Sequence, residues 1–154
     1  MLESFYYFIV TVFLYIEFKY IVDTRESIEK ITKMQSISES LKTKEVEYEN
    51  MSAEEKWVLI NIILKAFVVL FTVFVGIFTS QWPIWVGTML INLVFMSPYT
   101  KFLKRTIGEN YRQDNRYVTA IWINSVLGFA AALFVLINKF HLHLDILEIV
   151  KNFF

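Results

Sequence analysis

The chain contains 154 residues, of which 56% are hydrophobic, 18% are aromatic and only 19% are charged. Soluble domains average about 45–50% apolar and about 25% charged residues, so this composition favours a membrane protein. Fifteen basic residues balance fifteen acidic ones, and a net charge of zero provides no overall field that would attract nucleic acid. The lack of cysteine excludes disulfides, thiolate metal sites and a cysteine nucleophile.

Residues 4–22 form the first apolar segment and the first predicted membrane span. Its uninterrupted apolar part, residues 5–16, is also short enough for an interfacial or re-entrant segment. No basic region precedes it and no small-x-small cleavage pattern follows it, so we expect it to remain attached as an anchor.

Two further apolar segments in the middle of the chain predict two spans joined by a short turn. At about 1.5 Å per residue, residues 57–79 can cross a hydrocarbon core of about 30 Å, whereas residues 83–98 only just reach. Pro83 suits the first turn of the second of these helices. Residues 117–138 form the last span. The sequence therefore predicts an all-α, polytopic integral membrane protein with four transmembrane helices, or three if the first segment does not cross, in one membrane domain (residues 1–154).

The polar segment 23–56 is expected to be a helical loop. Its apolar residues recur nearly every three residues, which does not fit a heptad repeat, so two short helices broken near residues 35–38 are expected instead of a coiled coil. Ser36-x-x-Glu39 and Ser52-x-x-Glu55 both have the spacing of a capping box, and the second lies directly before the span at Trp57.

The basic loop 99–116 and the tail 139–154 complete the chain. Ser97 and Pro98 have the residue types of an N-cap and a first helical position, and predict a short basic helix over residues 99–107 that ends at Gly108. A polar loop follows it. The tail is amphipathic and predicts a helix that lies in the membrane interface.

The distribution of Lys and Arg predicts the orientation. Eleven of them lie in segments 23–56 and 99–116, and only two, Lys139 and Lys151, lie in the segments expected on the other side. By the positive-inside rule, both loops should be cytoplasmic and both termini outside, in a bacterial inner or plasma membrane. The four tryptophans fall near the expected span ends, as aromatic belts do.

Lys65 is the single charged residue between Trp57 and Ser97. A lysine at mid-bilayer costs about 2.5–3.5 kcal/mol on insertion scales, so a compensating contact is expected, and Glu17 in the same leaflet is the predicted partner. The pair can be part of a gate or an ion path. Alternatively, Lys65 simply extends its ammonium group towards the headgroups.

Small and polar residues share one face of the second span. In lipid such a face should contact other helices or line water. Asn92 and Asn124, in the third and fourth spans, are possible hydrogen-bonding partners, and Gly128-x-x-x-Ala132 has a spacing that permits close helix packing. The residues on the face are Asn61, Lys65, Thr72, Gly76 and Thr79.

Two other groups could bind ions or headgroups. On a helix, His141, Asp145 and Glu148 share a face and offer ligand types that suit zinc, although the wet side of an interfacial helix has the same composition. The short basic helix that carries Lys101, Lys104 and Arg105 is expected beside the cytoplasmic membrane face, and is predicted to attract anionic lipid rather than nucleic acid.

The sequence contains no HExxH, GxSxG or Walker-type motif, and its four glycines are far apart, so neither an enzyme nor a cofactor is expected. The preferred prediction is a non-catalytic subunit, scaffold or regulator of a membrane complex that packs against other membrane proteins or itself. The alternative is an oligomeric pore or small transporter lined by Asn61, Lys65 and Thr72. An intramembrane or metal-dependent enzyme based on His141, Asp145 and Glu148 is a distant third. In size and span number alone, the chain is similar to holins and small phage exclusion proteins, and it carries no motif of either.

Overall fold

The computed structural model describes residues 2–43, 48–79 and 81–153, which are almost entirely helical and contain no strand. Three helical segments are long and apolar enough to cross a membrane, namely Glu3–Val22, Glu55–Ile77 and Asn115–Leu142. The all-α class is therefore confirmed, and three of the predicted spans correspond to helices of suitable length and apolarity.

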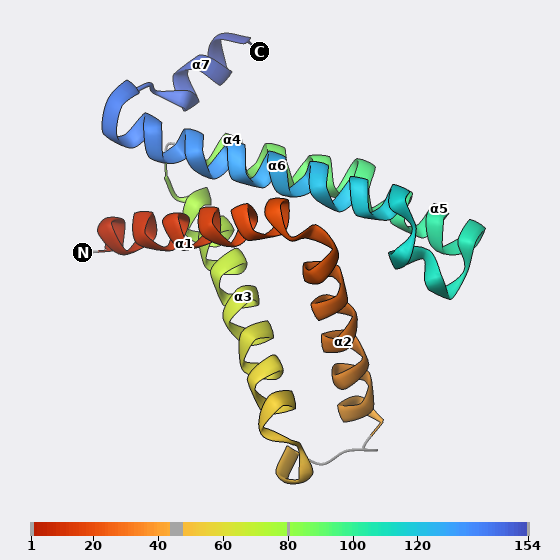
Figure 1. The fold of residues 1–154 in the computed structure, drawn as a ribbon. Helices are drawn as coiled ribbons and strands as arrows, with labels where there is room; N and C mark the ends of the chain where they lie inside the picture. The colour runs from red at the N-terminus through yellow and green to blue at the C-terminus, as the bar shows by residue number, and fades with distance from the viewer. Residues whose placement is uncertain (1, 44–47, 80, 154) are drawn as a thin grey trace.

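The core is centred on α1 (Leu2–Val22) and α6 (Asn115–Ile137), which run antiparallel and side by side (Figure 1). Aromatic and branched side chains of α1 pack on the small residues Ala131 and Ala132 of α6, which let the two helices approach closely. Val68 from the helix Ala53–Ile77 and Trp85 from the helix Trp82–Ile91 complete this buried cluster. Its members from α1 are Tyr6, Ile9, Val10 and Phe13.

The second helix is continuous, and the predicted break near residues 35–38 is wrong. α2 (Thr24–Lys42) runs through this region, with Ile28 and Ile37 buried. The Ser36 hydroxyl donates to the Lys33 carbonyl (2.7 Å) within the helix, so it does not form the predicted capping box. A serine that bonds to a carbonyl of the preceding turn is tolerated inside a helix, which explains why the local signal fails here.

The third helix begins with the predicted capping box. α3 (Ala53–Ile77) starts after Ser52, whose Oγ accepts from the Glu55 N–H (3.2 Å), while the Ser52 N–H donates to the Glu55 carboxylate (2.9 Å). In Figure 1, α2 and α3 extend away from α1 side by side. Only 11% of the apolar stretch of α3 is buried, so most of its surface is left for lipid or for other helices.

The region after the turn is also continuous, so Ser97 does not begin a new helix as predicted. α4 (Trp82–Ile91), with Pro83 in its first turn, leads into a π-helical segment (Asn92–Met96) and then into α5 (Ser97–Ile107). The Ser97 N–H donates to the Asn92 carbonyl, five residues back. Pro98 has no N–H and clashes with the carbonyl of the preceding turn, and a π turn is a known way to absorb such a disruption.

The basic helix α5 ends at Gly108, as predicted. Gly108 has φ 87°, a left-handed value that favours glycine. The predicted polar loop contains a short 3-10 helix, Glu109–Gln113, and Asp114 then caps α6 through its bond from the Arg116 N–H (2.8 Å).

The C-terminal tail is not one helix. α6 passes into a π segment (Asn138–Leu142), His143 adopts a left-handed conformation (φ 50°), and a separate helix α7 (Ile146–Phe153) follows. The prediction of one amphipathic helix from residue 139 is therefore wrong, and the amphipathic helix is confined to α7.

Two groups of connectors lie at opposite ends of the α1–α6 pair. One end holds the start of α1, the turn from α3 to α4 and the junction of α6 with α7. At the other end, Arg25 Nη2 donates to Asn115 Oδ1 (2.6 Å), and Ile28 of α2 packs with Leu103, Tyr111 and Tyr117. Segments 25–28 and 103–116, in the two predicted cytoplasmic loops, therefore meet at one end of the molecule.

Candidate functional site

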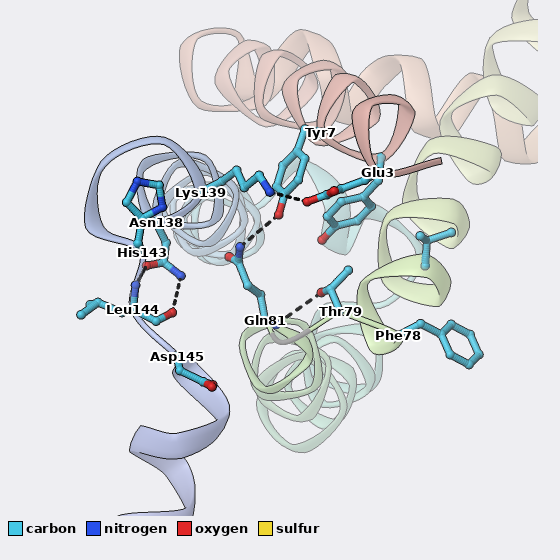
Figure 2. A pocket seen from close by; sticks show the side chains of 12 residues that line it. Glu3, Tyr7, Phe78, Thr79, Gln81, Asn138, Lys139, His143, Leu144 and Asp145 are labelled. Atoms are coloured by element: carbon cyan, nitrogen blue, oxygen red, sulfur yellow. Dashed lines mark hydrogen bonds and ion pairs between the residues drawn. The ribbon is translucent and has the colours of Figure 1, made fainter. Parts of the chain in front are cut away.

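A polar cavity of about 620 Å³ lies where the start of α1, the α3–α4 turn and the α6–α7 junction meet (Figure 2). Its centre is occupied by Gln81, which is only 4% exposed. Gln81 Nε2 donates to the Tyr7 hydroxyl (3.3 Å), and the Gln81 backbone N–H donates to Thr79 Oγ1 (3.3 Å). Gln81 Oε1 is buried and accepts no hydrogen bond from any described residue.

An ion pair between Glu3 and Lys139 closes one side of this cavity and links the first helix to the last apolar segment. The Lys139 ammonium also lies 5.2 Å from the centre of the Tyr7 ring, a cation–π arrangement. In the adjoining buried cluster, Trp85 Nε1 donates a hydrogen bond to the Tyr6 hydroxyl (2.7 Å). These contacts fix the relative positions of α1, α4 and α6.

The far side of the cavity is formed by the α6–α7 junction. The Asn138 side chain donates to the Leu144 carbonyl (3.0 Å) and accepts from the Leu144 N–H (2.8 Å). Asp145 Oδ1 accepts from the N–H groups of Leu147 and Glu148 (3.0 and 3.1 Å) and caps α7.

The structure does not bring the predicted metal ligands together on one helix. His141 precedes the left-handed His143, whereas Asp145 and Glu148 follow it, so the predicted helical spacing does not apply. One Asp145 oxygen is already engaged by backbone donors. In the described ranges, no group of three or more His, Asp or Glu residues is placed to hold a metal ion.

Glu17 and Lys65 make their closest polar contacts with other residues. The Glu17 carboxyl interacts with the Ser125 hydroxyl and lies 3.1–3.3 Å from the place where a Cβ on Gly128 would be. Lys65 Nζ donates to the Tyr20 hydroxyl (3.1 Å) and lies 4.9 Å from the centre of that ring. Glu17 and Lys65 therefore form no ion pair with each other, because Glu17 is directed to α6 and Lys65 to Tyr20.

The predicted polar face of α3 is divided between the core and the surface. Thr72 is fully buried, with no described partner for its hydroxyl, and Gly76 lies directly under the Trp85 ring. Asn61 is exposed and donates to the Trp57 carbonyl (3.0 Å). Asn61, Lys65 and Thr72 therefore do not form one exposed stripe in a single chain.

The other predicted packing residues differ in exposure, since some are buried in the core and others lie on the surface. Ala132 is fully buried against α1, and the Glu17 side chain packs against the Cα of Gly128, where a larger residue would place its Cβ. Asn124 Oδ1 is buried without a described partner, whereas Asn92 is exposed at the start of the π segment. Lys101, Lys104 and Arg105 are exposed on α5, on either side of the buried Leu103.

Sequence reasoning missed the residues at the centre of the cavity, Tyr6, Tyr7 and Gln81. They come from segments more than 70 residues apart, and none belongs to a motif. The one available signal was a glutamine in an otherwise apolar turn, next to Trp82 and Pro83.

The fold defines this chain as an all-α protein with three helical segments suited to crossing a membrane. Comparison with protein-family models, with curated protein sequences and with solved structures finds no match to it.

Proposed function

We propose that this chain is a non-catalytic integral membrane protein that acts as a subunit, scaffold or regulator of a membrane complex. The exposed Asn92 is the observation that carries the proposal. Its Nδ2 donates to the Thr88 carbonyl (3.1 Å), and no described residue donates to its Oδ1. An amide that faces hydrocarbon with an unused acceptor is unfavourable, and a neighbouring transmembrane helix can satisfy it.

The surroundings of Asn92 support a helix-packing face. Leu93, Val94 and Phe95 are 59–66% exposed, so they are available to contact another helix. Asn92 lies about ten residues, or roughly 15 Å, from Trp82, which corresponds to mid-bilayer for a helix along the membrane normal. π segments inside helices occur frequently at functional sites.

This proposal includes the four-span arrangement. α4 and the following π segment form the fourth crossing, and the basic connectors lie on the cytoplasmic side. Both termini then lie outside, and α2 provides a charged cytoplasmic surface for a partner. The clustering of the two connectors at one end supports this arrangement.

An oligomeric pore lined by Asn61, Lys65 and Thr72 remains the alternative from the sequence. Thr72 would have to leave the core to face water, since it is fully buried against its neighbours. The Asn92 face requires no such rearrangement. We therefore favour the packing role.

Cross-linking in native membranes tests the proposal, because the chain has no native cysteine. Val94→Cys labelled with a benzophenone maleimide should, on irradiation, be captured as a complex with a second membrane chain or a second copy, because the benzophenone inserts into C–H bonds and needs no thiol on the partner. Phe8→Cys, which is also exposed but lies on α1, is the control position.

Substitution of Asn92 tests whether its side-chain amide contributes to the cross-linked contact. An interhelical hydrogen bond in a membrane contributes about 0.6 kcal/mol on average, so adding Asn92→Leu to Val94→Cys should lower the captured fraction roughly threefold. Asn92→Gln should retain most of the capture. Recovery of the monomer alone, or equal capture from Phe8→Cys, would contradict the proposal.

A further inference from the structure

A second cavity, of about 590 Å³, lies between α1, α2 and α3. Its lining includes four lysines, Lys19, Lys30, Lys33 and Lys65, and two glutamates, Glu26 and Glu29. Lys30 and Glu26 form an ion pair with each other on α2. Among the other lining residues, Lys19 and Lys65 outnumber Glu29, so the cavity has a positive excess although the whole chain is neutral.

Lys65 brings one of these charges deep into the apolar part of the molecule. It lies eight residues after Trp57, or about 12 Å along α3. Its contact with the Tyr20 hydroxyl is a hydrogen bond to a neutral group, so it does not neutralise the ammonium. A charge at this depth is stabilised by a water-filled cavity or by an anion.

Tyr20 is arranged to help bind such an anion. Its hydroxyl oxygen accepts from Lys65 Nζ (3.1 Å), which leaves its own proton available to donate. Lys19 lies on the same helix and lines the same cavity, with its ammonium 5.9 Å from the centre of the Tyr15 ring. Ammonium and phenol donors around one space suit the oxygens of a phosphate group.

The cavity is also partly apolar. Ile16, Met34 and Val58 line it together with the lysines. Beyond it, α3 presents exposed apolar side chains such as Ile60, Leu64 and Phe67. Acyl chains can lie on this surface while a headgroup occupies the polar part, an arrangement that a free soluble anion would not need.

We propose that the cavity between α1, α2 and α3 binds the phosphate headgroup of an anionic phospholipid, with Lys19, Lys65 and Tyr20 as its donors. In the proposed orientation the site lies towards the cytoplasmic side, where an anionic leaflet would be in contact with it. Bound lipid would supply the negative charge that Glu17, turned towards α6, does not supply by direct contact. The inference depends on the chain being embedded in a membrane, but not on the Asn92 interface.

Native mass spectrometry of the full chain in a neutral detergent tests the site. We expect one phosphatidylglycerol retained per chain, with much weaker retention of zwitterionic phosphatidylcholine. Each basic residue near anionic lipid contributes about 1 kcal/mol, which is about a fivefold change in affinity. Lys19→Gln combined with Lys65→Gln should therefore weaken retention roughly 25-fold.

Three controls make the result specific. Arg112→Gln combined with Lys151→Gln removes the same charge from positions outside this cavity and should leave the retained lipid unchanged. Lys65→Arg should restore retention, and helical circular dichroism verifies that each variant is folded. Equal loss in the variant that combines Arg112→Gln with Lys151→Gln, or equal retention of phosphatidylcholine, would overturn the proposal.

Competition with inorganic phosphate distinguishes a lipid headgroup from a soluble phosphate ion, since both offer phosphate oxygens to the same donors. If millimolar phosphate displaces phosphatidylglycerol and binds as tightly without acyl chains, the lipid assignment is overturned in favour of a soluble phosphate site. If phosphate has no effect, the acyl contribution from the α3 surface is supported. Neither outcome affects the cross-linking from Val94→Cys, so the two proposals can fail independently.

Discussion

Gly76 offers the most direct test of the packing between α3 and α4. A Cβ at this position would lie 2.4 Å from Cδ1 and 2.7 Å from Nε1 of Trp85. The Trp85 ring is only 2% exposed and is hydrogen-bonded to Tyr6. It therefore cannot move without breaking that bond or displacing the core around α1.

The expected cost of Gly76→Ala follows from these contacts. Overpacking a core by one methyl group typically costs 1–3 kcal/mol, and the better helix propensity of alanine offsets about 1 kcal/mol of it. Gly87→Ala is the matched control, because nothing lies within 4 Å of its added Cβ. This control receives the propensity gain alone, so the two variants should differ in unfolding free energy by roughly 1–3 kcal/mol.

Thermal unfolding in detergent measures this difference. A change of 1 kcal/mol corresponds to about 2–4 °C for a chain of this size, so the midpoint of Gly76→Ala should lie at least a few degrees below that of Gly87→Ala. Combining Gly76→Ala with Trp85→Leu should remove the penalty, because the clash is with the ring. Equal midpoints for the two alanine variants would refute the close approach of α3 and α4.

Three further predictions concern helix ends and orientation. The hydrogen bond from the Arg116 side chain holds the pKa of the Asp114 carboxyl below its ordinary value of 3.8. The ionised Asp114 carboxyl therefore stabilises the fold above that pH, and this contribution is lost as the pH falls through the pKa of the folded state. The difference in thermal unfolding midpoint between wild type and Asp114→Ala should be constant above about pH 5 and should shrink below about pH 4. Ser52→Ala should lower the free energy of unfolding by about 1 kcal/mol and speed amide exchange at the start of α3. Ser36→Ala should leave the free energy of unfolding almost unchanged, because the Ser36 hydroxyl bonds within its own helix. Equal effects of the two substitutions would contradict these roles. In intact cells, an impermeant maleimide should label Ser4→Cys and leave Ser36→Cys unlabelled, and the reverse pattern would exclude the proposed orientation.

Long apolar segments made most of the helices predictable. The expected spans 4–22, 57–79 and 117–138 correspond to α1, α3 and α6 within a few residues, because a continuous apolar run has few alternatives in a bilayer. The Ser52 capping box and the Gly108 terminus were predictable for a local reason, since each satisfies backbone groups within one turn.

The incorrect predictions arise where a local stop signal is overridden. Ser36 has the residue type of a cap, but its hydroxyl is satisfied inside α2. Ser97-Pro98 has the residue types of a helix start, but the π turn lets the chain pass the proline without a break. In both places the sequence shows the possibility of an end, and contacts outside the local segment decide whether the helix continues.

The partners of the intramembrane charges could not be predicted from depth alone. Glu17 and Lys65 were paired because both lie in one leaflet, yet Glu17 is directed to α6, where the lack of a side chain on Gly128 leaves room for the carboxyl and Ser125 provides a hydroxyl. Choosing between these partners requires the rotation of α1 about its axis, which is set by the packing of Tyr6, Val10 and Phe13 on Ala132 and Val135. Because that packing turns Glu17 towards α6, Lys65 Nζ hydrogen-bonds to the neutral Tyr20 hydroxyl and forms no ion pair with Glu17, and this is the reason to look for an anionic headgroup beside α3.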